Sequence, residues 1–405
     1  MVHKNLILMC LAVLCASLFL VFLPTVFSEH YLFQGDMDLE KNATTSPKIK
    51  FAPSYVSTPG VVKGIYMTSW TASSPKYRDG LVKLVDSTEL NSIVIDIKDY
   101  SGKIVFPIVD NSILKAYGSE EVRIRDLQDF IESLHKKGIY VIGRIAVFQD
   151  AYFVKHRPDL AVKNKLGTEV WKDRKGISWV DAGSREYWDY IILLAKEARE
   201  IGFDEINFDY IRFPSDGNMQ DISYPWSTTT PKAEVLKEFF QYLHNNLISP
   251  MSDIGEKNRM KISADLFGMV TTATDDMGIG QVLENALPYF DYISPMVYPS
   301  HYPPTFQGFK EPEAHPYEVV HFALEGAVTR ADKFDLATST PNNPVVGSTH
   351  YRARIRPWLQ DFGLRQNYGP SEIRAQIKAT NDNGLSSWLL WSASNKYTSS
   401  ALQIE

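Results

Sequence analysis

Residues 202–213 read GFDEINFDYIRF, and this stretch decides the fold. From residue 205 onward polar and apolar side chains alternate, so that Glu205, Asn207 and Asp209 share one face. Such alternation predicts a β-strand, because successive side chains of a strand point to opposite sides of its sheet. Charged groups are costly inside a protein unless they are paired or needed for function. We therefore expect a strand that carries acidic groups toward a polar site.

Seven other segments have strand-like composition, which gives eight predicted strands in all: 61–67, 92–98, 139–147, 205–211, 260–267, 292–298, 353–360 and 387–391. Amphipathic, helix-like segments separate most of them: 77–89, 124–137, 184–201, 232–248, 279–287, 318–331 and 371–381. This order predicts the α/β class with a parallel sheet, and eight units predict a (β/α)8 TIM barrel over residues 61–405. An open doubly wound sheet is the alternative. Its glycine-rich first turn is missing from MTSW at 67–70.

The N-terminus precedes this barrel with a hydrophobic segment and a tether. Residues 6–27 are almost wholly apolar and long enough to span a bilayer, although cleavage after Ser28 as a signal peptide is the alternative. Either outcome exports the barrel, which is then membrane-anchored or secreted. Residues 1–28 are thus expected to be a signal anchor or signal peptide. Residues 29–60, rich in Ser, Thr, Pro and Lys, are expected to be a linker.

Composition excludes several classes of function. Of 405 residues, 44% are hydrophobic, which is enough for a packed core, and a net charge of −6 speaks against a nucleic-acid partner. The nine histidines are scattered without a His-x-His pair, and both cysteines lie in the first fifteen residues. There is no Gly-x-Ser-x-Gly elbow. We therefore predict no cofactor and no metal site.

Polar side chains gather where the predicted strands end, which is the face that carries the chemistry in TIM barrels. Strand alternation predicts that six of them point inward: Asp96, Lys98, Arg144, Asn207, Asp209 and Asp265. A structural ion network among Asp96, Lys98 and Arg144 is one interpretation, and substrate binding is the other. For Asp209 and Asp265 a catalytic role is favoured. Aromatic rings at two strand ends, Tyr298 and Trp391, predict stacking against sugar rings, and His301 is a further candidate for contact with the substrate.

Several strand-end motifs together resemble those of a known family. They are GFDEINFDYIRFP at 202–214, IDIKD at 95–99, GRIAVF at 143–148, MVYPSHY at 296–302 and RPWLQDF at 356–362. They are similar to a glycoside hydrolase-like family of exported bacterial proteins, a TIM-barrel domain of unknown function distantly similar to alpha-amylase-like glycosidases. The resemblance covers about residues 61–400. It implies a glycosidase barrel that acts through two carboxylates.

The resemblance also implies roles for individual residues. Asp209 would be the nucleophile or base and Asp265 the acid, with Asp361 as a third candidate that could stabilise the transition state or pair with Asp209. Asn207 would bind a sugar hydroxyl, and Arg212 would orient Asp209. Amylase-like enzymes carry Glu where this chain has Asp265, and Arg where it has Asn207, so the assignment of roles stays open.

The predicted function is that of a glycoside hydrolase acting on an extracellular or cell-envelope polysaccharide or oligosaccharide. Two alternatives stay open. One is a catalytically inactive carbohydrate-binding barrel. The other is a non-hydrolytic polysaccharide-processing enzyme, such as a lyase with Lys98 or Tyr298 as its base.

Overall fold

The computed structural model describes residues 52–108, 111–248, 259–338 and 351–404. Its parallel strands close into one barrel in the order β1 to β8, as the sequence predicts. Their bounds are β1 Lys63–Met67, β2 Ser92–Lys98, β3 Tyr140–Ala146, β4 Glu205–Asp209, β5 Lys261–Phe267, β6 Tyr292–Met296, β7 Trp358–Gln360 and β8 Trp388–Trp391. The predicted hydrophobic segment 6–27 lies outside the described residues. Within the described ranges, no helix has the length and apolar character to cross a membrane.

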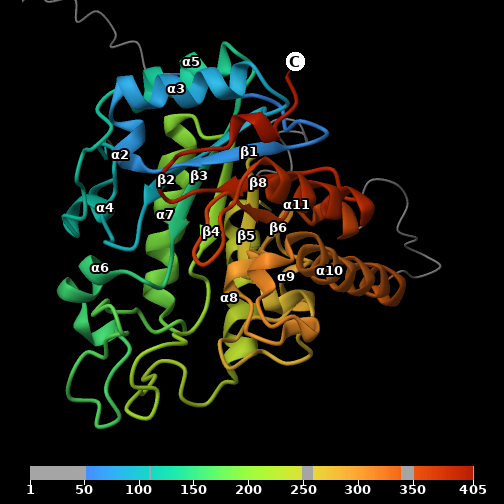
Figure 1. Cartoon of the computed structure of the whole chain (residues 1–405). Coiled ribbons are helices and arrows are strands. Elements are labelled where there is room, and N and C mark those ends of the chain that lie inside the picture. The colour runs from blue at the N-terminus through green and yellow to red at the C-terminus, as the bar shows by residue number, and fades with distance from the viewer. Residues whose placement is uncertain (1–51, 109–110, 249–258, 339–350, 405) are drawn as a thin grey trace, which may run out of the picture. The chain divides into compact units, whose positions relative to one another are not determined.

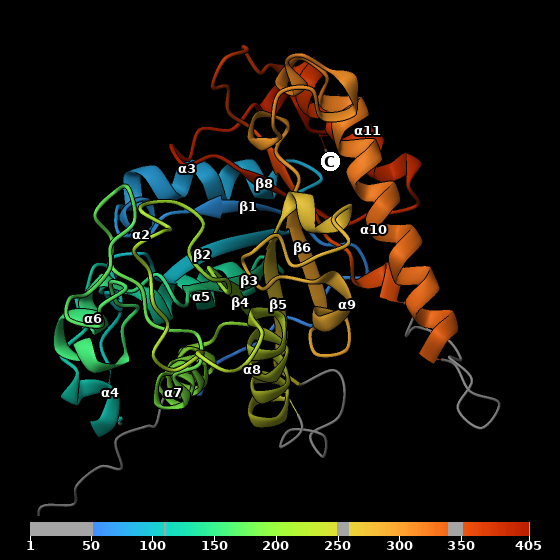
Figure 2. The same cartoon turned by 90° about the horizontal axis from the view of Figure 1, so that it is seen from below.

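Helices surround the strands, and α10 packs beside α11 while α7 packs beside α8 (Figures 1 and 2). The helix bounds are α2 Ser69–Ala72, α3 Pro75–Asp86, α4 Ser112–Ala116, α5 Leu127–His135, α6 Ala151–His156, α7 Arg185–Ile201, α8 Lys232–Leu247, α9 Leu283–Ala286, α10 Pro316–Thr338 and α11 Pro370–Asp382. This arrangement of a closed parallel barrel within helices is the (β/α)8 fold.

Two elements, β7 and α9, are less than half as long as the sequence predicts. Strand β7 covers only Trp358–Gln360, because a 3₁₀ helix occupies Tyr351–Arg354 and Pro357, just before the strand, has no N–H for the ladder. Helix α9 begins only at Leu283. Gly280 stands before it with φ +83°, a left-handed conformation that a continuing helix cannot contain.

The pleat of each strand divides the apolar residues into two clusters. On β2, Ile93 and Ile95 belong to the large cluster between strands and helices. Val94 lies between them and belongs to a small cluster inside the barrel, with Trp358 and Leu389. Alternate residues of a barrel strand therefore face inward, as the predicted side-chain alternation requires.

Lys98 is an exception to this alternation and corrects the prediction that it shares the inner face with Asp96. The register between β2 and β3 shifts at this point, where Asp96 is opposite Arg144 but Lys98 is opposite Ile145. The extra residue of such a bulge reverses the side that the next side chain faces. Lys98 Nζ accordingly donates to Asp150 Oδ2 at 2.7 Å and to the hydroxyl of Tyr187 on α7 at 3.2 Å.

The last residues of the predicted linker contact the barrel. The backbone N–H of Val56 donates to the Asp204 carboxylate at 2.8 Å, and the Arg199 guanidinium lies 3.4 Å from the centre of the Tyr55 ring. The described end of the linker is thus held at the start of β4. A tether over the preceding residues stays a prediction.

Candidate active site

The barrel interior holds two groups of buried arginines and carboxylates. Deeper in the barrel, at the first residue of β4, Glu205 pairs with Arg356, and both side chains are fully buried. Arg356 Nη1 donates to Glu205 Oε2 at 3.1 Å, and the Ser263 hydroxyl donates to Glu205 Oε1 at 2.5 Å. We call Glu205 and Arg356 the inner ion pair. Its charges are matched one to one, and neither residue lines the cavity described below.

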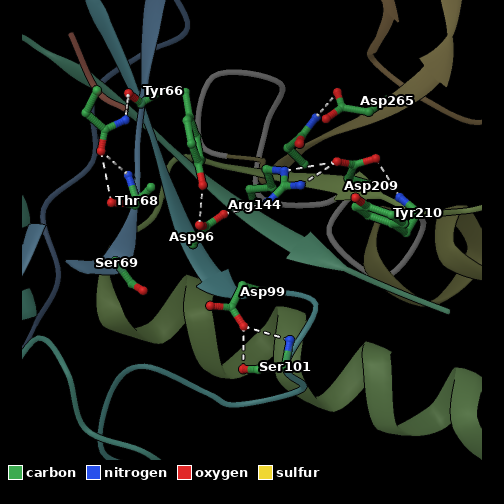
Figure 3. A network of polar contacts seen from close by, with 12 residues as sticks. Tyr66, Thr68, Ser69, Asp96, Asp99, Ser101, Arg144, Asp209, Tyr210 and Asp265 are labelled. Carbon is green, nitrogen blue, oxygen red and sulfur yellow. Dashed lines mark hydrogen bonds and ion pairs between the residues drawn. The ribbon is translucent and has the colours of Figure 1, made fainter. Parts of the chain in front are cut away.

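The second group lies four residues further along β4, and we call Arg144, Asp96 and Asp209 the Arg144 cluster (Figure 3). Arg144 Nη1 donates to Asp96 Oδ1 at 2.6 Å, and its Nη2 and Nε donate to Asp209 Oδ2 at 2.5 and 3.1 Å. The Tyr66 hydroxyl donates to the other oxygen of Asp96 at 2.5 Å. One cation therefore bridges two acids. Burial alone would lower the pKa of Arg144, but the charges of Asp209 and Asp96 raise it well above its usual value.

Asp209 is held by N–H groups on both of its oxygens. Oδ1 accepts the backbone N–H of Tyr210 at 2.6 Å, while Oδ2 accepts both N–H groups from Arg144. Tyr210 has φ 53°, a left-handed conformation that is rare for residues other than glycine. The local turn after β4 thus aims a backbone donor at the carboxylate. Three N–H donors, two of them from a cation, therefore hold the two oxygens of Asp209 in place.

Asp265 is buried in a different environment on β5. Its Oδ1 accepts the side-chain N–H of Asn207 and the indole N–H of Trp358, each at 2.8 Å. Burial, and next the negative charge of Asp209, raise the pKa of Asp265 to about 8, although these two hydrogen bonds and Arg144 act in the opposite direction. Asp265 therefore holds its proton at neutral pH.

A cavity of about 310 Å³ opens beside these two acids. Seven of the residues predicted from the sequence line it: Arg144, Asp209, Arg212, Asp265, Tyr298, His301 and Trp391. Six other lining residues were not predicted: Tyr210, Phe267, Gly268, Met269, Met296 and Tyr302. Two predicted residues stand behind the lining, Asp96 on Arg144 and Asn207 on Asp265. The structure thus brings nine of the eleven candidates together.

The other two candidates lie elsewhere. Lys98 is enclosed with Asp150 and Tyr187, as described above. Asp361, which follows β7, accepts the backbone N–H of Thr398 at 2.9 Å and its hydroxyl at 2.8 Å. These two bonds occupy both of its oxygens, and Asp361 is not among the residues that line the cavity. It anchors the segment after β8.

The Trp391 ring lines the cavity and is held by two aromatic rings that do not line it, Tyr66 and Trp358. Trp391 stacks on Tyr66 at 4.0 Å between ring centres, and the Arg144 guanidinium lies 5.3 Å from the Trp391 ring. Opposite the edge of Trp391 stands Trp358, with ring centres 5.5 Å apart. Such fixed rings suit stacking against the apolar faces of sugars. The sequence singled out Trp391 but not Tyr66, whose inward position on the first strand was the available signal.

Two further residues of the cavity supply polar groups. Burial lowers the pKa of His301, so its ring is neutral at neutral pH, and Ser300 Oγ lies 2.9 Å from its Nδ1. Burial, with the charges of Asp265 and Asp209, raises the pKa of Tyr298 well above its usual value. Both side chains can therefore exchange hydrogen bonds with hydroxyl groups in their neutral forms. Among the described residues, no group of three or more His, Cys, Asp and Glu side chains could hold a metal ion.

Comparison with known proteins finds relatives of this chain in fold and in sequence. A solved structure of the glycoside hydrolase domain of PgaB (BpsB) from Bordetella bronchiseptica has a TM-score of 0.53 and 11% identity, covering 82% of this chain and 94% of that one. A hypothetical protein from Ruminiclostridium thermocellum ATCC 27405 is 31% identical over 53% of this chain and 98% of its own, with a TM-score of 0.44. None of the curated proteins matches the chain. Residues 64–397 match a family model described as "Putative glycosyl hydrolase domain", and the chain belongs to that family.

Proposed function

We propose that the protein is a glycoside hydrolase in which Asp265 donates a proton to the glycosidic oxygen and Asp209 acts as nucleophile or base. One observation carries this proposal. Two carboxyl groups at the same cavity have opposite surroundings, since Asp209 accepts three N–H bonds and Asp265 has its pKa raised to about 8. In glycosidases, acid and base roles are usually set by such differences in the surroundings of two carboxyl groups.

The chemistry follows from these two states. Asp265 gives its proton to the leaving oxygen as the bond between that oxygen and the anomeric carbon breaks. Asp209 either bonds to the anomeric carbon, to be displaced later by water, or removes a proton from a water molecule that attacks this carbon. Water supplies the new hydroxyl in both cases. Arg144 is then a positioning residue, because its two N–H bonds to Oδ2 hold the Asp209 carboxylate in place.

The proposal also covers substrate and location. The Trp391 ring, which lines the cavity and is fixed by stacking on Tyr66, suits a polysaccharide or oligosaccharide. The apolar segment 6–27 supports export, so we infer an extracellular or cell-envelope glycan as substrate and a barrel that is anchored to the membrane or secreted. Membrane attachment through residues 6–27 is part of this proposal.

A lyase with Lys98 or Tyr298 as base has less support. Lys98 is enclosed in an ion pair with Asp150 and does not line the cavity. The pKa of Tyr298 is raised well above its usual value, which makes its phenolate scarce at neutral pH. Neither group is therefore suited to removing a proton from a bound sugar.

The test is release of reducing ends from a panel of envelope and extracellular polysaccharides. We expect product from the wild type, and Asp209→Asn should lower the rate by on the order of 10⁴-fold. Asp79→Asn is the matched control, because Asp79 is exposed on α3 and distant in sequence from every strand end of the site. Equal rates for wild type and Asp209→Asn would remove Asp209 from the mechanism. Binding of a glycan without product release would favour the inactive carbohydrate-binding barrel.

A further inference from the structure

Arg212 differs from the other arginine of the cavity in what surrounds it. It follows β4 by three residues and lines the cavity. Its guanidinium lies among three aromatic rings, 4.9 Å from the centre of Trp179, 5.3 Å from Phe267 and 5.6 Å from Tyr210. Contacts of this kind hold a guanidinium in place without neutralising its charge.

The hydrogen bonds of Arg212 leave part of the guanidinium unused. Nη1 donates to the Phe213 carbonyl at 3.0 Å and to Ser215 Oγ at 3.2 Å. Within the described part of the chain, Nε and Nη2 have no acceptor and no carboxylate forms an ion pair with Arg212. Arg144, in contrast, is matched by two acids. Arg212 is thus the cation of the cavity that lacks a counter-ion.

The acids nearest to Arg212 are engaged with other groups or lie outside ion-pair distance. Its charge is affected by Asp209, Asp216 and Asp173. Asp209 is bound by Arg144, and Asp173 accepts the indole N–H of Trp179 at 3.1 Å and three further N–H groups. Burial lowers the pKa of Arg212, although a guanidinium still keeps its charge at neutral pH. The side chain is only partly buried, and Nε and Nη2 are not among the buried polar atoms that lack a partner, so this edge of the guanidinium is open to a ligand in the cavity.

We propose that the substrate carries a carboxylate on a sugar ring next to the scissile bond, and that Arg212 binds this group through Nε and Nη2. The two free N–H donors of a guanidinium edge match the two oxygens of a carboxylate. The inference rests on the proposed function for placing the sugar in this cavity, and it adds the chemical class of the glycan. Uronic acid residues are the simplest sugars of that class.

Binding and cleavage can be tested separately. The probes are oligosaccharides of polygalacturonate, alginate and hyaluronan, each compared with its carboxyl-reduced form, which keeps the backbone and linkage but has lost the charge. Binding is measured by calorimetry on the Asp265→Asn variant, so that turnover does not interfere. We expect at least one acidic probe to bind roughly 10- to 100-fold more tightly than its carboxyl-reduced form.

Variants assign this preference to a side chain. In the Asp265→Asn background, Arg212→Gln should remove the preference for the acidic probe, and Arg212→Lys should keep part of it. Arg365→Gln is the matched control, because Arg365 lies beside the same rim but has Glu313 as its partner at 3.6 Å. Thermal unfolding of each variant checks that it folds. An acidic preference that survives Arg212→Gln, or equal binding of acidic and reduced probes by the parent, would overturn the inference.

The two proposals fail in different ways. If carboxylate-dependent binding is seen but the wild type releases no product from the bound glycan, the hydrolase is wrong and the role of Arg212 stands. If the wild type cleaves a glycan but binds its acidic and carboxyl-reduced forms equally well, the role of Arg212 is wrong and the hydrolase stands.

Discussion

The inner ion pair and the Arg144 cluster are built from the same residue types in one barrel, but they differ in balance and in access. Arg356 meets one carboxylate, Glu205, and both side chains are fully buried. Arg144 meets two, and it lines the cavity together with Asp209. Ser263 links the two levels, because it donates to Glu205 and accepts from Asn207, which in turn donates to Asp265.

The difference teaches that a buried arginine-carboxylate pair is not by itself a sign of function. A matched and sealed pair is a structural element, and often no more stabilising than apolar residues of the same volume would be. An excess of acid beside an open cavity is different, because it leaves one carboxyl group unmatched. That group is Asp265, which lies beside the Arg144 cluster, and burial, with the negative charge of Asp209 next, raises its pKa. Substitutions in the inner ion pair and around the cavity test this difference.

The largest effect on folding is expected at the inner ion pair. Arg356→Met leaves the enclosed Glu205 without its cation, although the Ser263 and Tyr140 hydroxyl groups still donate to it, which should lower the free energy of unfolding by about 3 to 5 kcal/mol. Adding Glu205→Gln should recover much of this loss. Urea unfolding measures both effects. A change below about 1 kcal/mol in the single variant would mean that the pair is not sealed as described.

A smaller effect is expected from the pH dependence of stability. The folded-state pKa of Asp265, about 8, lies above the ordinary value of about 3.9, so the folded protein binds a proton that the unfolded chain releases. This contribution to stability is complete below about pH 4 and is lost as the pH rises through about 8. Between pH 5 and pH 9 the wild type should therefore lose more stability than Asp265→Asn. Parallel unfolding curves for the two proteins would contradict the raised pKa.

The smallest effect is expected at Asp361. Asp361→Asn weakens the two hydrogen bonds to Thr398, which should cost about 1 kcal/mol of unfolding free energy. Hydrolysis should stay within about twofold of the wild-type rate, because such changes away from the reacting groups are usually mild. Rate assays on the glycan that the wild type cleaves provide the check. A drop in the hydrolysis rate as large as that expected for Asp209→Asn would mean that Asp361 is one of the two catalytic carboxylates.

Much of the fold and the centre of the site could be predicted from the sequence, because both depend on local patterns. Alternation on β4 and β5 placed Asn207, Asp209 and Asp265 correctly inside the barrel. Lys98 could not be placed in this way, since one bulged residue on β2 reverses its side and no sequence pattern marks that bulge.

Hydrogen-bond partners on distant strands also could not be predicted from the sequence. The hydrogen bond of Trp358 to Asp265 joins β7 to β5 across the barrel, and no spacing along the chain encodes it. Asp361 shares the strand-end position of the other acids, but its contact with Thr398 depends on how the segment after β8 folds back. The protonation of Asp265 likewise depends on burial and on Asp209, which are properties of the assembled barrel.

The most direct measurement is the titration of Asp265 by NMR, with ¹³C-labelled aspartate carboxyl groups and Asp265→Asn to assign the signal. The account predicts a midpoint near pH 8 in the wild type. Asp209→Asn removes the neighbouring negative charge and should lower this midpoint, whereas the exposed control Asp79→Asn should leave it unchanged. A midpoint near 4 in the wild type, or one that does not respond to Asp209→Asn, would contradict the claim that these two acids form a catalytic pair.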